Sequence, residues 1–148
     1  MKISIGSDHA GFEQKQQLVE YLTGLGHEVI DHGPDSDERV DYPDYAVKVA
    51  MDVSFKRADY GVLVCGTGIG MCIFANKIVR VRAANVTIPE FAELARAHND
   101  ANVVCLSGRF IDIDTNKKIV DVFLSTEFEG GRHAQRLAKL LPLERTGA

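Results

Sequence analysis

The sequence predicts an α/β protein in which five strands form a doubly wound parallel sheet, with helices on both faces. Short apolar runs alternate with helical segments along the whole chain. The run YGVLVCG is apolar throughout, which is typical of a strand covered on both faces. A length of 148 residues suits one core, so we expect a single domain over residues 1–148. Crossovers between such strands are right-handed.

The first half of the chain is expected to contain two strands and two helices. Residues 2–6 form the first strand, and residues 12–26 form a helix with leucines at helical spacing. Gly26 suits the C-terminal cap of that helix. Residues 27–33 form the second strand, and residues 42–58 form a helix with one apolar face.

The second half repeats this alternation. The expected strands are 60–66, 81–86 and 102–108. The expected helices are 71–77, 89–100, 115–126 and about 132–141. Pro89 suits the first turn of its helix, and Gly130-Gly131 separates the last two helices.

Composition excludes several function classes. The formal net charge is −4, with no basic stripe of the kind that binds nucleic acid. No apolar stretch approaches the length of a membrane span, and the first residues resemble no targeting segment. The three cysteines lie in apolar runs, and no CxxC or HxxxH spacing indicates zinc. We therefore expect a cytoplasmic protein that binds neither nucleic acid nor membrane.

The segments that follow the strands are expected to carry the site. In doubly wound sheets, ligands bind at the carboxyl ends of the strands. These segments are Ser7 to His9, Asp31-His32, Cys65 to Gly70, and Ser107 to Arg109. One edge of the sheet should therefore carry a carboxylate, an imidazole, a thiol, a glycine loop and a guanidinium.

The glycine loop CGTGIGM does not fit the common nucleotide-binding patterns. Its glycines are spaced GxGxG, so Met71 stands where a dinucleotide site needs its last glycine. The next strand ends in Asn85-Val86 and offers no acidic residue for a ribose. No GK[ST] follows, which excludes a P-loop, and no arginine stands where a phosphatase loop needs one.

Two interpretations of this loop remain open. Converging backbone N–H groups before a helix can hold a phosphate or an oxyanion, and they favour a thiolate at Cys65. Alternatively, the loop is a tight turn beside a buried cysteine. Alternating glycines favour the functional interpretation. Cys72, inside the following helix, is expected to pack.

Other candidates each have a structural alternative. Asp8 can cap a helix, whereas His9 at a helix start is unfavourable unless it meets an anion. His98 can simply interact favourably with the C-terminal end of its helix. Arg132 and Arg136 lie one turn apart, where they either share an anion or form a solvated face. Three further histidines carry no signal beyond a surface or capping role: His27, His32 and His133.

Together these motifs resemble the type B ribose-5-phosphate isomerases, a family that includes galactose-6-phosphate isomerase subunits. They are GSDHAG, YPDYA, VLVCGTGIGMCIFANK, RAA, HNDANV and EGGRHAQR, in order from residue 6 to residue 136. The resemblance implies a Rossmann-like fold and the interconversion of an aldose phosphate with its ketose phosphate in pentose phosphate metabolism. It also implies an enediolate intermediate, without metal or nucleotide cofactor.

The resemblance also implies site residues. Cys65 would be the base, Thr67 would assist proton transfer between oxygens, and His98 would open the sugar ring. The backbone of Gly66, Gly68, Ile69 and Gly70 would stabilise the enediolate. Sugar contacts would come from Asp8, Tyr42 and Asn99, and phosphate contacts from His9, Arg109, Arg132 and Arg136. The family builds its site between two chains, so a homodimer or a dimer of dimers is implied.

Two segments depart from the family pattern. Residues 78–82 lack the usual proline-glycine turn, and residues 107–112 read SGRFID rather than GGRVVG. The alternatives are therefore an isomerase of a hexose 6-phosphate, such as allose or galactose 6-phosphate, or of a tetrose phosphate. A non-catalytic sugar-phosphate sensor is a further alternative.

Overall fold

A computed structural model describes residues 1–145 and contains a five-stranded sheet. The strand order is β2-β1-β3-β5-β4, and every pairing is parallel. The strands are β1 Lys2–Ser7, β2 Glu28–Asp31, β3 Tyr60–Cys65, β4 Ala83–Asn85 and β5 Val103–Ser107. The predicted parallel α/β sheet is confirmed.

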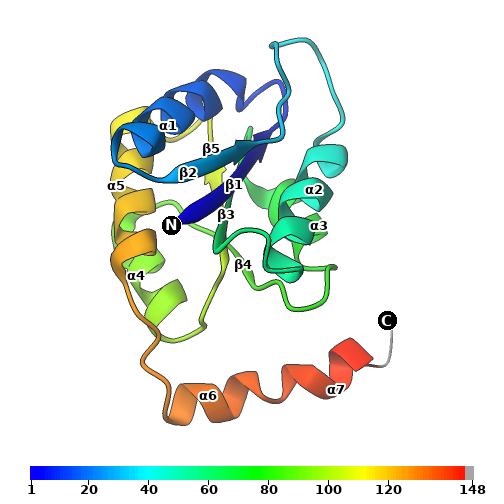
Figure 1. The fold of residues 1–148 in the computed structure, drawn as a ribbon, viewed down its shortest axis with the longest axis vertical. Coiled ribbons are helices and arrows are strands. Elements are labelled where there is room, and N and C mark those ends of the chain that lie inside the picture. The colour runs from blue at the N-terminus through cyan, green and yellow to red at the C-terminus, as the bar shows by residue number, and fades with distance from the viewer. Residues whose placement is uncertain (146–148) are drawn as a thin grey trace.

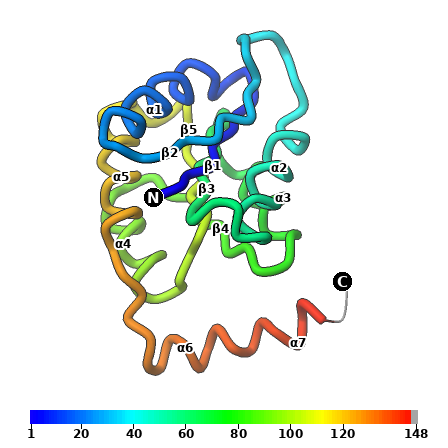
Figure 2. Tube along the Cα trace, viewed as in Figure 1, coloured from blue at the N-terminus to red at the C-terminus, as the bar shows by residue number. Residues whose placement is uncertain are grey.

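Helices cover both faces of this sheet. They are α1 Phe12–Gly24, α2 Tyr42–Ser54, α3 Ile69–Ala75, α4 Pro89–Ala97, α5 Ile113–Ser125, α6 Arg132–Leu137 and α7 Leu140–Arg145. Figure 1 shows α1, α4 and α5 on one side of the sheet and α2 and α3 on the other. The chain then leaves α5 and runs as an arm, α6 and α7, beyond the sheet (Figure 2). In residues 1–145 there is no helix whose length and hydropathy would let it span a bilayer.

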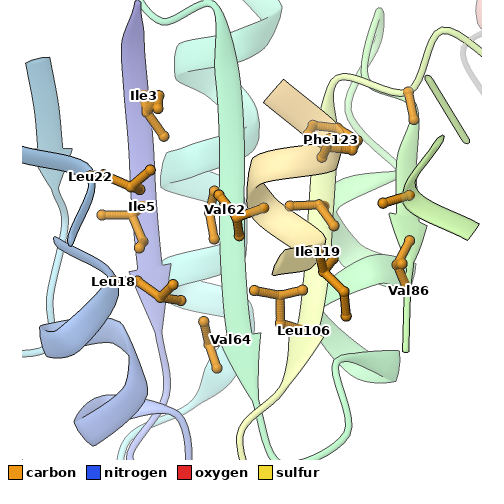
Figure 3. Packing of buried hydrophobic residues seen from close by; sticks show 14 of the residues in the cluster. Ile3, Ile5, Leu18, Leu22, Val62, Val64, Val86, Leu106, Ile119 and Phe123 are labelled. Carbon is orange, nitrogen blue, oxygen red and sulfur yellow. The ribbon is translucent and has the colours of Figure 1, made fainter. Parts of the chain in front are cut away.

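Two hydrophobic cores follow from the two covered faces. Ile5, Val62 and Phe123 belong to the core beneath α1, α4 and α5, part of which is drawn in Figure 3. Leu63 belongs instead to the core beneath α2 and α3. Successive strand residues point to opposite faces. This alternation explains why β3 is apolar at every position, as the sequence predicted.

The turn before α1 lies directly against the end of β3. A Cβ atom built on Gly11 would lie 2.3 Å from the carbonyl oxygen of Val64. The backbone N–H of Asp8 donates a hydrogen bond to that same oxygen. The absence of a side chain at Gly11 therefore lets the Asp8–Gly11 turn reach the strand that ends in Cys65.

The closing helix predicted over about 132–141 is wrong as one continuous element. It is divided into α6 and α7 by a turn at Ala138-Lys139. Pro142 has no N–H to donate to Ala138, and the N–H of Leu141 bonds that carbonyl instead. This tighter bond interrupts the α-helical pattern. The predicted Gly26 terminus is confirmed, since Gly26 follows α1 with φ +91°.

Candidate active site

The carboxyl ends of β1, β3 and β5 lie side by side. Ser7 is opposite Val64, and Cys65 is opposite Ser107. The residues that follow these strands therefore share one edge of the sheet, as the sequence predicted. We call this the carboxyl edge.

The loop that follows Cys65 folds back onto its thiol. The backbone N–H of Gly68 donates a hydrogen bond to Cys65 Sγ over 3.1 Å. Gly68 has φ +85°, a conformation that favours glycine. A Cβ atom there would lie 2.4 Å from Asn85 Nδ2. Both the conformation and the space at this position require glycine.

Neighbouring strand ends hold this loop in place. Ser107 Oγ donates to the carbonyl of Gly66 over 2.7 Å, and Arg109 N–H donates to the same oxygen over 3.2 Å. Asn85 Nδ2 donates to the carbonyl of Thr67 over 3.1 Å. Asn85 stands where a dinucleotide site needs an acid, and here it fixes the glycine loop instead.

The start of α3 completes the loop. The helix begins at Ile69, two residues before its predicted start. The exposed Thr67 accepts a hydrogen bond at Oγ1 from the N–H of Ile69 over 3.1 Å. The Tyr42 ring lies over Gly70, where a Cβ atom would come within 2.7 Å of it. Tyr42 is the first residue of α2, so this contact brings α2 to the mouth of the loop.

Asp8 and His9 take different positions at the carboxyl edge. Asp8 is buried, and its Oδ1 accepts a hydrogen bond from the N–H of Gly11 over 3.0 Å. This bond closes the turn before α1 but does not cap the helix, whose N-cap is Gly11, so the capping alternative for Asp8 is wrong. His9 accepts a hydrogen bond at Nδ1 from the N–H of Val40 over 3.3 Å. His9 also lines a cleft of about 390 Å³ together with Arg109.

The remaining candidates lie at the opposite edge of the sheet, which we call the amino edge. His98 follows the last residue of α4, and the chain then reaches Asn102, whose carbonyl accepts a hydrogen bond from Gly61 at the start of β3. Four strand steps lie between Gly61 and Cys65, about 13 Å at roughly 3.3 Å per residue. His98 therefore lies far from Cys65 within one chain.

Asn99, Arg132 and Arg136 belong to the same amino edge. Asn99 directly follows His98, and Glu129, just before α6, donates its N–H to the carbonyl of Ala97 over 3.0 Å. This bond holds the start of α6 beside the end of α4. The structure thus divides the candidates into two groups within one chain.

His133 is a residue that sequence reasoning missed. The expectation of a surface or capping role is wrong, because His133 is buried and stacks on His98. The ring centroids are 4.2 Å apart, and the planes differ by 12°. The two residues are far apart in the sequence, so no spacing pattern could predict the contact.

Cys72 packs against the core beneath α2 and α3, as expected, but its thiol is also acidic. Its pKa is lowered to about 7, because the Cys105 thiol and the backbone of Asn85 hydrogen-bond to it and outweigh its burial. Burial raises the pKa of Cys105 well above its usual range. Cys72 is half-buried on α3, so its thiol combines partial access with an acidic character.

A parallel α/β domain with a thiol, an imidazole and a glycine loop at its carboxyl edge is typical of proteins that bind a small anionic molecule. A sequence model described as Ribose/Galactose Isomerase matches residues 3–140. The chain belongs to this family.

Comparison with individual relatives indicates which isomerases of this family the chain is similar to. Ribose-5-phosphate isomerase B of Escherichia coli K12 is 45% identical over 143 residues, covering 97% of this chain and 96% of its own. The structure of Clostridium thermocellum ribose-5-phosphate isomerase B matches with a TM-score of 0.98 and 44% identity over all of both chains. That of the Mycoplasma genitalium enzyme with bound ribulose-5-phosphate matches with a TM-score of 0.94 and 46% identity, over 97% and 96%. The chain is therefore an aldose–ketose isomerase similar to these B-type enzymes.

Proposed function

We propose that the chain interconverts ribose 5-phosphate and ribulose 5-phosphate through an enediolate, with Cys65 as the base. The observation that carries the proposal is the hydrogen bond from the Gly68 N–H to Cys65 Sγ. It places a nucleophilic atom and a backbone donor in one loop. Proton abstraction beside a carbonyl needs such a base and a stabiliser for the developing oxyanion.

The proposed reaction is a proton transfer that begins and ends on carbon. The Cys65 thiolate removes the C2 proton of the open-chain aldose, and the electron pair moves to the carbonyl oxygen to give the enediolate. Thr67 assists the transfer of a proton between O2 and O1. The thiol then returns its proton to C1, which gives the ketose. Backbone N–H groups of the Gly66 to Gly70 loop that are not already bonded to Cys65 or Thr67 would stabilise the oxyanion.

The phosphate is proposed to bind to cationic groups from both edges. His9 and Arg109 line one cleft at the carboxyl edge. Arg132 and Arg136 lie on α6, which belongs to the amino edge. Guanidinium groups bind phosphate through paired hydrogen bonds, and a sugar phosphate is a dianion at neutral pH.

The proposed site is therefore completed by a second copy of the chain. His98 and Asn99, which would open and bind the sugar, cannot reach Cys65 of their own chain across the sheet. Asp8 and Tyr42 would bind sugar hydroxyls from the carboxyl edge. Exposed apolar side chains support contacts between copies on both sides of the sheet: Ile73 and Phe74 on α3, and Phe91 and Leu94 on α4. We propose a homodimer or a dimer of dimers that acts in the cytoplasm.

A panel of aldose phosphates, assayed for ketose formation in chelator-treated buffer, tests the function. The panel contains ribose 5-phosphate, allose 6-phosphate, galactose 6-phosphate and a tetrose phosphate. We expect the highest kcat/KM with ribose 5-phosphate. Adding divalent metal after chelation should leave that value unchanged.

Other results would select other functions. Preferred turnover of a hexose or tetrose phosphate would change the assigned substrate. Residues 78–82 and 107–112 would then be the segments expected to set that preference. Binding of all sugars without turnover would favour a sugar-phosphate sensor. Turnover only after metal is restored would contradict a reaction that depends on Cys65 alone for proton abstraction.

A further inference from the structure

The His98 ring rests on a buried partner. His133 on α6 is only 5% exposed, and its ring stacks on His98 with centroids 4.2 Å apart. Its Nε2 atom is buried and makes no hydrogen bond within residues 1–145. The His98 side chain, by contrast, is 37% exposed. One face of the His98 imidazole is therefore covered while part of the ring remains accessible.

A carboxylate lies beside both rings. Glu129 Oε2 is 3.5 Å from His133 Nε2 and 3.9 Å from His98 Nε2. The hydrogen bond from the Glu129 N–H to Ala97 fixes the backbone of this residue against the end of α4. The position of the carboxylate is thus coupled to the segment that carries His98.

Two histidines and a glutamate are also a common set of metal ligands, and their ligand atoms lie within 4.8 Å of one another. A metal bound by histidine lies in the ring plane, about 2.0–2.1 Å from the nitrogen. The planes of His98 and His133 are within 12° of parallel and are stacked, so one ion cannot lie in both. This arrangement supports packing of one ring by the other rather than chelation.

The charges around His133 favour a neutral ring. Burial lowers its pKa, and so do the neighbouring His98, Arg132 and Arg136, while Glu129 opposes them. A neutral His133 covers the face of His98 without adding a second positive charge beside it.

We propose that His133 and Glu129 are positioning residues that hold the His98 imidazole by its face and its edge for opening of the sugar ring. This inference rests on the proposed function, in which His98 acts on the cyclic aldose. His133 touches no reacting atom. It limits the rotation of His98, so the exposed part of that ring keeps one orientation toward the substrate.

Three variants distinguish the effect of the stacked ring from the effect of the neighbouring charge, and a control variant shows any general effect on the protein. His133→Ala removes the stacked ring, His133→Phe keeps a flat ring without nitrogen, and Glu129→Gln keeps the shape without charge. Gln135→Ala, at an exposed position of α6, is the matched control. Each is assayed for kcat and KM with ribose 5-phosphate. Each is also tested for exchange of the C1 proton of ribulose 5-phosphate in D₂O, which starts from an open chain and needs no ring opening.

We expect His133→Ala to lower kcat for the cyclic aldose by up to about 100-fold, the scale of a misplaced catalytic group, with KM nearly unchanged. Its deuterium exchange should stay near the unaltered rate. His133→Phe should retain most of the activity, Glu129→Gln should fall between them, and Gln135→Ala should be unaffected. Titration of the unaltered protein with Zn²⁺ should show no binding that depends on His133.

Four results would overturn the inference: full kcat in His133→Ala, equal loss of turnover and exchange in that variant, a His133→Phe variant as impaired as His133→Ala, or His133-dependent Zn²⁺ binding. The proposed function fails separately. It fails when the unaltered chain neither isomerises ribose 5-phosphate nor exchanges the ribulose 5-phosphate proton.

Discussion

The backbone N–H of Gly68 points at the sulfur of Cys65 and donates to it over 3.1 Å. A thiol at the end of a strand is thereby held by the same loop that is proposed to stabilise the oxyanion. Base and stabiliser are parts of one rigid unit, because Ser107 and Asn85 fix the loop from the neighbouring strand ends.

Replacement of the thiol should separate catalysis from binding. We expect Cys65→Ala to lower kcat by at least about 100-fold, the usual contribution of a general base. Binding of a non-reactive sugar phosphate, measured by calorimetry, should persist because the phosphate contacts remain. Cys72→Ala is the control and should keep its turnover. Unchanged kcat in Cys65→Ala would remove the base assignment.

Glycine at position 68 should be required for both stability and activity. In Gly68→Ala, the added Cβ would meet Asn85 and would force an unfavourable φ, at a cost of at least about 1 kcal/mol. Thermal unfolding and kcat should both fall. Gly24→Ala is the matched control, since a Cβ there meets nothing within 4 Å. That variant should be as stable as the unaltered chain or slightly more so.

Cys72 should be open to modification by a mild alkylating reagent, because it is half-buried and acidic. Its pKa of about 7 makes about half of it thiolate at neutral pH, and thiolates react faster than thiols. Mass spectrometry after brief iodoacetamide treatment should show labelling of Cys72 that rises with a midpoint near pH 7. Cys105, buried and with a raised pKa, should stay unlabelled. Prompt labelling of Cys105 would contradict the structure.

A buried carboxylate on α2 should contribute to stability in a pH-dependent way. Burial opposes the charge of Asp52, but hydrogen bonds from His32, Arg57 and Ser4 outweigh it and lower its pKa. The folded state therefore binds this proton less readily than the unfolded state. The resulting stabilisation is present above the ordinary aspartate pKa near 3.9 and is lost as the pH falls below it.

Asp52→Ala should accordingly lower the free energy of unfolding at pH 7 by about 1–3 kcal/mol, because Ser4, His32 and Arg57 lose a hydrogen-bond acceptor. The difference from the unaltered chain should shrink as the pH falls below about 4. Urea unfolding at several pH values measures both effects. Glu20→Ala, which removes an exposed carboxylate on α1, serves as the control. A difference that stays constant with pH would exclude the carboxylate as its source.

Two inactive variants should restore each other when mixed. Cys65→Ala removes the base from the carboxyl edge, and Arg136→Ala removes a cation from the amino edge. Each mixed dimer contains one site with both defects and one with neither, so random exchange of equal amounts should restore about a quarter of the sites. Failure to recover activity, despite subunit exchange shown by native mass spectrometry, would contradict a shared site.

The strands and the carboxyl edge could be predicted because they depend on local pattern. The unbroken apolar run of β3 indicates burial on both faces, and a parallel sheet then brings Cys65, Asp8 and Arg109 to one edge. The helix boundaries were less accurate. The division of α6 from α7 arises because Pro142 has no backbone N–H to continue the helical hydrogen bonds.

The features of the candidate site that were not predicted depend on contacts between segments that are distant in the sequence. The stacking of His133 on His98 joins α6 to the end of α4, and nothing in either segment alone indicates it. The acidity of Cys72 arises from Cys105 on a different element. The separation of His98 from Cys65, by contrast, could have been predicted, because His98 precedes the strand β5 and therefore lies at the opposite edge of a parallel sheet from Cys65.

Strand β5 joins the two edges, since the chain enters it after His98 and Asn99 and leaves it into Ser107 to Arg109. In a shared site, the two ends of this strand serve different catalytic centres. A cell that makes equal amounts of normal chain and chain defective at one end would keep about half of its centres, whereas a defect that reaches both ends would leave about a quarter.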